Sequence, residues 1–72
     1  MVKTAGINTE LLDSAIEKSG LRTGFIVEKL GISRQAFDRK RKGEIAFRQS
    51  EVYVLCDLLR LDETQGTEIF FP

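Results

Sequence analysis

The 72-residue chain contains no histidine and no tryptophan, and its only cysteine is Cys56. A single thiol cannot form an internal disulfide, and without histidine it leaves no plausible ligand set for a zinc or other metal site. Cys56 stands near Leu55 and Leu58, so we expect it to be a small core residue. Because the chain also lacks a glycine-rich phosphate loop and scatters its carboxylates, we expect no enzyme, no cofactor and no small-molecule substrate.

Long apolar runs are missing as well. No segment approaches the ~18 consecutive apolar residues of a membrane span, and no basic and apolar leader indicates secretion. We therefore expect a cytoplasmic protein without membrane contact. The composition, with 42% hydrophobic and 31% charged residues, is that of an ordinary globular protein. A chain of this length is expected to form one domain, residues 1–72, that buries only about 60% of its potential surface.

The formal net charge is zero, but the charges are unevenly distributed. Residues 21–48 hold eight basic and three acidic residues, whereas residues 49–72 hold one basic and five acidic residues. A basic centre beside an acidic end can act locally on a charged partner although the total charge is zero. Neutrality of the whole chain therefore does not exclude nucleic acid as a partner.

Apolar residues recur with helical spacing, and no segment alternates long enough to indicate a strand. The pattern predicts helices over residues 9–19, 24–30, 33–42, 49–60 and 63–70. Polar residues stand where they can cap the starts of helices: Asn8 or Thr9, Thr23, Ser33 and Asp62. Glycines stand where they can end three of the helices: Gly20, Gly31 and Gly43. We therefore predict an all-α bundle of four to five helices.

Several apolar residues outside the regular pattern also have expected positions. In the connection 43–48 we expect Ile45 and Phe47 to pack back into the core. Two adjacent phenylalanines on a helix cannot both face one core, so we expect either Phe70 or Phe71 to be exposed and open to a partner.

The most informative segment runs from Thr23 to Lys42 and combines a short amphipathic helix, a tight turn and a polar, basic helix. Gly31 supplies the backbone freedom for the turn, and Ile32 fills the gap between the two helices. The second helix has little apolar surface beyond Phe37, so we expect it to dock through that residue and leave the rest exposed. This pattern predicts a helix-turn-helix over residues 23–42.

A helix held in this way can enter the major groove of DNA. Arginine can bind guanine and glutamine can bind adenine through paired hydrogen bonds, and basic or hydroxyl side chains can bind phosphates. We expect the base-facing residues to be Arg34, Gln35, Asp38 and Arg39, and the phosphate contacts to be Thr23, Lys40, Arg41, Lys42 and Arg48. Asp38 has a second interpretation, as an ion-pair partner of Arg34 or Lys42 one helical turn away.

The run from Leu30 to Glu44, Phe47 with Ser50 and Glu51, and the ending from Glu68 to Phe71 resemble the small phage regulators of the Cro and repressor helix-turn-helix family. The resemblance extends from about residue 9 to residue 71. It implies a lambda-repressor-like DNA-binding domain with residues 33–42 as the recognition helix. By resemblance, the base-facing positions are those of Ser33, Arg34, Gln35, Asp38 and Arg39, and the role is repression or a lytic/lysogenic switch.

Two functional hypotheses follow from these observations. In the first, the chain is a DNA-binding transcription regulator, and because one small domain seldom supplies enough affinity, it binds a palindromic operator as a homodimer. In the second, it is a protein-binding modulator or antirepressor that uses the same fold to bind a partner repressor. Zero net charge, Asp38, the acidic C-terminal third and the apolar tail favour the second hypothesis.

Overall fold

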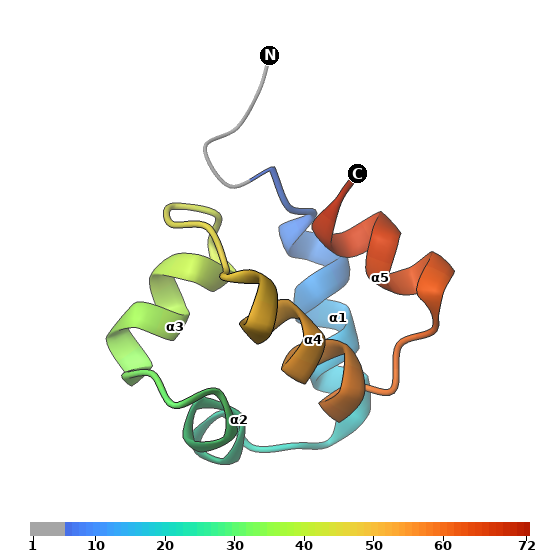
Figure 1. The fold of residues 1–72 in the computed structure, drawn as a ribbon. Helices are drawn as coiled ribbons and strands as arrows, with labels where there is room; N and C mark the ends of the chain where they lie inside the picture. Colours follow the sequence, from blue (N-terminus) through green and yellow to red (C-terminus); the bar gives the residue numbers. More distant parts are fainter. Residues whose placement is uncertain (1–5) are drawn as a thin grey trace.

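A computed structural model describes residues 6–72 of the chain. It contains five α-helices and, within those residues, no strand, which confirms the predicted all-α bundle (Figure 1). The helices are α1 (Thr9–Ser19), α2 (Thr23–Leu30), α3 (Arg34–Arg41), α4 (Gln49–Leu58) and α5 (Glu63–Phe70). None of the helices in this part of the chain is long and apolar enough to cross a membrane.

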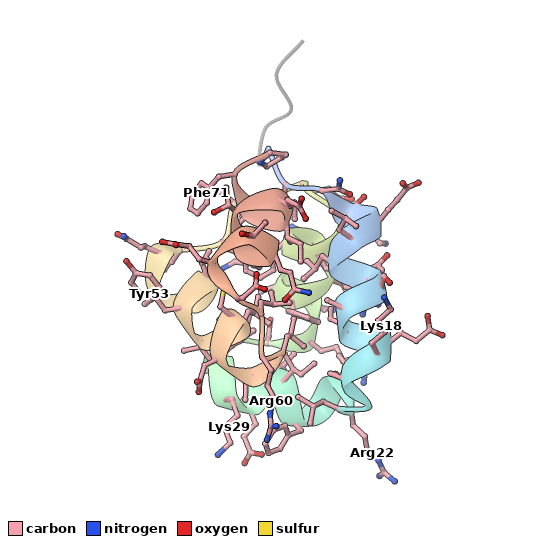
Figure 2. All side chains as sticks on the ribbon, turned by 90° about the vertical axis from the view of Figure 1, so that its right-hand side faces the viewer. Lys18, Arg22, Lys29, Tyr53, Arg60 and Phe71 are labelled. Atoms are coloured by element: carbon pink, nitrogen blue, oxygen red, sulfur yellow. The ribbon has the colours of Figure 1, made fainter. Side chains whose placement is uncertain are left out.

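The helices pack in two linked groups. Helix α1 lies against α5 and α3, and α2 lies against α3 and α4. Helices α3 and α5 therefore stand on opposite sides of the bundle, with α1 and α4 between them, as both views show (Figures 1 and 2). The fully buried side chains at the centre are Leu12, Ile26, Phe37 and Leu55, one from each of the first four helices. Ile69 and Phe70 of α5 belong to the same buried cluster, so a single core holds all five helices in place.

Most of the predicted helix ends are confirmed. The side-chain oxygen of Asn8 accepts a hydrogen bond from the Leu11 amide at 3.1 Å, and Asp62 and Gln65 form a capping box at the start of α5. Gly20 is the C-cap of α1 and Gly31 that of α2, both in the left-handed conformation with φ of 72°. These short polar contacts satisfy backbone groups that a helix end leaves without intrahelical partners.

Three predicted helix ends are wrong by one or two residues. Helix α3 ends at Arg41 with Lys42 as its C-cap, so Gly43, with φ of 84°, follows the cap instead of forming it. Thr23 is not the cap of α2 but its first residue, because Arg22 is the last residue with extended backbone angles, and Arg22 makes no side-chain capping bond. Helix α4 ends at Leu58 instead of Arg60, because Arg60 adopts a left-handed conformation with φ of 55°. In that turn the Leu61 amide donates to the carbonyl of Cys56 at 2.9 Å, which closes the end of the helix.

The connection between α3 and α4 returns to the core through one residue only. The ring of Phe47 packs edge-on against Phe37 and Phe70, with centroid distances of 6.3 and 5.8 Å. Ile45, which was expected in the core, is exposed, because it lies in the turn that leaves α3 before the chain reaches Phe47. The three rings of Phe37, Phe47 and Phe70 link α3, the connection and α5.

The C-terminal phenylalanines separate as expected. Phe70 is buried, whereas Phe71 is 69% exposed and projects from the surface, as does Tyr53 of α4 (Figure 2). The buried stripe of α4 is formed by Val52 and Leu55, and Leu59, the C-cap of the helix, extends it. Cys56 is half-buried beside this stripe, and its surroundings raise the pKa of its thiol through desolvation.

Candidate nucleic-acid interface

Helices α2 and α3 are joined by a tight turn of three residues, Gly31 to Ser33. The amide of Gly31 donates to the carbonyls of Val27 and Glu28, and the Ile32 amide also donates to Val27, so the end of α2 folds back on itself. The hydroxyl of Ser33 then accepts from the Ala36 amide at 3.0 Å and caps α3, as predicted. The two helices contact each other across this turn. The local sequence thus sets both the end of α2 and the start of α3.

Phe37 attaches α3 to the rest of the molecule. Its side chain is completely buried, and it contacts Phe47 in the following connection. The polar side chains of the first turns of α3 are exposed, and Ala36 is half-buried. Exposed residues at the predicted base-facing positions are Ser33, Arg34, Gln35, Asp38 and Arg39. The predicted polar and basic face is therefore exposed, on the side of the bundle away from α5 (Figure 1).

The predicted phosphate contacts do not share one environment. Lys42 and Arg48 are exposed, whereas Thr23 and Arg41 are half-buried. The exposed part of α3 and its C-cap carries Arg34, Arg39 and Lys42 against one carboxylate, that of Asp38. A cluster with this excess of positive charge favours an anionic partner even though the whole chain is neutral.

Lys40 departs from its predicted place. It is only 8% exposed, and its Nζ lies 2.7 Å from Oε1 of Glu51 in α4. Residues 37 and 40 are three apart in a helix, so their side chains lie on the same side, and that side of α3 faces the core. Lys40 is therefore not on the exposed surface, in contrast to its predicted role as a phosphate contact. Its i+3 spacing from the anchoring Phe37 was the sequence signal for burial.

Glu51 was not predicted as a functional residue, yet it connects three segments. Its Oε1 accepts from Lys40 and also from the Arg48 amide at 2.9 Å, which closes the N-terminus of α4. Burial by itself raises the pKa of Glu51. The hydrogen bonds from Lys40 and Arg48, together with their positive charges, outweigh burial and hold the pKa of this carboxyl below its ordinary value of 4.5.

This lowered pKa predicts a loss of stability in acid. A carboxyl whose pKa is lower in the folded state stabilises the fold above its unfolded-state pKa, and that contribution is lost as the pH falls through the folded-state pKa. We expect the difference in unfolding free energy between the natural chain and Glu51→Gln to be constant near pH 7 and to shrink below about pH 4.5. Urea unfolding at a series of pH values measures this difference, and parallel pH profiles of the two proteins would contradict it.

Arg41 makes a second link, from α3 to α1. Its Nε lies 2.7 Å from Oδ1 of Asp13, and its guanidinium carbon lies 5.9 Å from the centre of the Phe37 ring. This pair is more exposed than the Lys40–Glu51 pair, so water screens it more strongly. These two pairs are the only ion pairs among residues 6–72, so the alternative expectation that Asp38 pairs with Arg34 or Lys42 is not met there.

Comparison with protein-family models, with curated proteins and with solved structures gave no match to this chain.

Proposed function

We propose that this protein is a DNA-binding transcription regulator of the phage or prophage type, and that residues 23–42 form a helix-turn-helix. The observation that carries the proposal is the exposure of a polar, basic helix held by one buried aromatic residue, Phe37. In this proposal α3 enters the major groove of double-stranded DNA in the cytoplasm. Its N-terminal turn is the part that approaches the bases.

The exposed side chains of α3 have the chemistry that base recognition requires. Arg34 and Arg39 can donate paired hydrogen bonds to guanine, Gln35 can both donate to and accept from adenine, and Asp38 can accept from a cytosine amine. Outside this reading face, Lys42 and Arg48 are exposed and free to approach phosphates, and Thr23 lies at the N-terminus of α2. Arg41 uses only Nε for Asp13, so its other N–H groups remain available for a phosphate.

We also propose that the protein binds its operator as a homodimer. One eight-residue reading helix makes few base contacts, whereas two copies on a palindromic operator double them. The exposed aromatic residues Phe71 and Tyr53 lie outside the α2–α3 unit and offer apolar surface to a second copy.

The exposed apolar surface of Phe71 and Tyr53 also supports the second candidate function, that of a modulator or antirepressor. Phe71 and Tyr53 accompany an acidic segment, residues 49–72, and apolar surface beside charge is typical of a protein-binding face. In that case a partner repressor, and not DNA, is the ligand.

A salt titration of binding to a pool of random double-stranded DNA distinguishes the two functions. The DNA-binding function predicts that the logarithm of the affinity falls linearly with the logarithm of salt concentration, with a slope of about −0.9 for each phosphate contacted. Arg34→Ala or Gln35→Ala is expected to change the selected sequence, at a cost of about 1–3 kcal/mol for each lost base contact. Lys18→Ala, an exposed cation of α1 seen in Figure 2, is the matched control and is expected to leave the selected sequence unchanged.

A different pair of results would support the modulator function. If the purified protein is not retained on DNA at low salt and forms a stoichiometric complex with a repressor, the DNA-binding function is wrong and the modulator function is supported.

A further inference from the structure

We infer that Lys40 and Glu51 are positioning residues, whose buried ion pair sets the angle at which α3 presents Arg34, Gln35 and Arg39. The inference rests on the proposed DNA-binding function, but it assigns roles to two residues that do not themselves reach the ligand. It follows from how few points attach α3 to the bundle.

Helix α3 has eight residues and only three strong attachments besides its contact with α2. Phe37 is buried in the core, Lys40 binds Glu51, and Arg41 binds Asp13. Phe37 is the fourth residue of the helix, and Lys40 and Arg41 are its last two. Packing of a ring alone allows the helix to rotate about that point, since apolar contacts have no preferred direction. The two ion pairs oppose such a rotation.

The distance from the attachments to the reading end makes the angle important. Arg34 lies three residues before Phe37, which corresponds to ~4.5 Å along the helix axis. A rotation of about 10° about Phe37 therefore moves the backbone at Arg34 by ~0.8 Å. Hydrogen bonds to base edges tolerate smaller displacements, because their donor–acceptor distances vary by only about 0.5 Å.

The Lys40–Glu51 pair is better suited than the Arg41–Asp13 pair to hold this angle. Its carboxylate is itself fixed, because the same Oε1 accepts from the Arg48 amide at the start of α4. Both members are buried, so the attraction is weakly screened, whereas the side chain of Asp13 is 54% exposed. A directional contact between two buried, fixed groups is the kind of interaction that selects one arrangement among several apolar ones.

The decisive experiment measures DNA affinity against salt for variants of these two residues, together with the angle of α3 in the free protein. Glu51→Gln removes an acidic charge, so general electrostatics predicts equal or tighter DNA binding. The positioning role predicts the reverse, a loss of about tenfold in specific affinity, comparable to one base contact. For Lys40→Met it predicts a similar loss with an unchanged salt slope, because no phosphate contact disappears. Lys42→Met is the matched comparison and is expected to reduce the slope by about one.

Two double variants separate positioning from simple loss of stability. Lys40→Met/Glu51→Leu replaces the pair by apolar groups, which keeps the net charge and the fold but removes the directional contact. We expect it to discriminate specific from random DNA about tenfold less well. Lys40→Arg/Glu51→Asp retains an ion pair with one longer and one shorter side chain, and is expected to recover most of the discrimination.

The inference is overturned if Lys40→Met lowers the salt slope by about one, since Lys40 then contacts a phosphate. It is also overturned if Lys40→Met/Glu51→Leu discriminates DNA as well as the natural chain. Residual dipolar couplings of backbone amides in the free protein give the angle between α3 and α4 without any DNA. If the natural chain does not bind DNA, the proposed function fails, and an unchanged angle in the apolar double variant would separately reject the positioning role.

Discussion

Phe37→Ala is expected to lower the free energy of unfolding by about 3–5 kcal/mol. The ring is completely buried, contacts Phe47, and provides the only large apolar anchor of α3. A domain of this length has a total stability of about 4–11 kcal/mol, so the substitution removes a large part or all of it. Urea or thermal unfolding followed by circular dichroism measures the change.

Phe71→Ala is the matched control for this prediction. It is the same chemical change at a side chain that is 69% exposed, so we expect an effect within about 0.5 kcal/mol. If the two substitutions destabilised the protein equally, Phe37 would not be the anchor described above. A Phe37→Leu variant is expected to fall between them, because leucine refills part of the space that alanine leaves empty.

Lys40→Met is expected to cost about 3–5 kcal/mol of stability, because it leaves the carboxylate of Glu51 buried without its cation. Lys40→Met/Glu51→Leu, in contrast, is expected to be about as stable as the natural chain, since neither variant residue then needs a charged partner. The double variant also loses the hydrogen bond from the Arg48 amide, which offsets part of the stability that it regains over Lys40→Met. Urea unfolding of the single and double variants at pH 7 gives the coupling between the two sites.

The more exposed ion pair, between Arg41 and Asp13, provides the comparison for the predicted cost of Lys40→Met. Asp13→Asn breaks the contact with Arg41, and we expect it to cost less than about 1 kcal/mol because water screens that pair. A Lys40→Met variant that is destabilised no more than Asp13→Asn would show that burial adds nothing to the Lys40–Glu51 pair.

Helix positions and their caps could be predicted closely because they depend on neighbours within one turn. Asn8, Ser33 and Asp62 bind amides three residues away, so the cap and its partner belong to the same short stretch of sequence. The errors at Thr23 and Arg60 are small for the same reason: the competing choices differ by a single residue's backbone angles.

The environments of individual side chains were harder to predict. Ile45 and Phe47 are both large, apolar and two residues apart, yet only Phe47 contacts Phe37 and Phe70. Which of the two reaches the core depends on the path of the connection from α3 to α4, and no local pattern contains that information. In the run from Arg39 to Lys42, four adjacent cations occupy exposed, buried, half-buried and exposed positions. The spacing from Phe37 indicates that Lys40 is the buried one, but it does not indicate that Glu51 is its partner.

The sequence by itself determined that five short helices form and which of them is the polar helix that follows a glycine turn. It also determined that Phe37 must hold this polar helix. These properties follow from spacing and capping, which act over a few residues. Only the tertiary structure decided that Lys40 turns inward to Glu51 and that Arg41 reaches Asp13, eleven and twenty-eight residues away. The physical reason is that a cation is stable in the interior only where a distant segment brings a carboxylate to it.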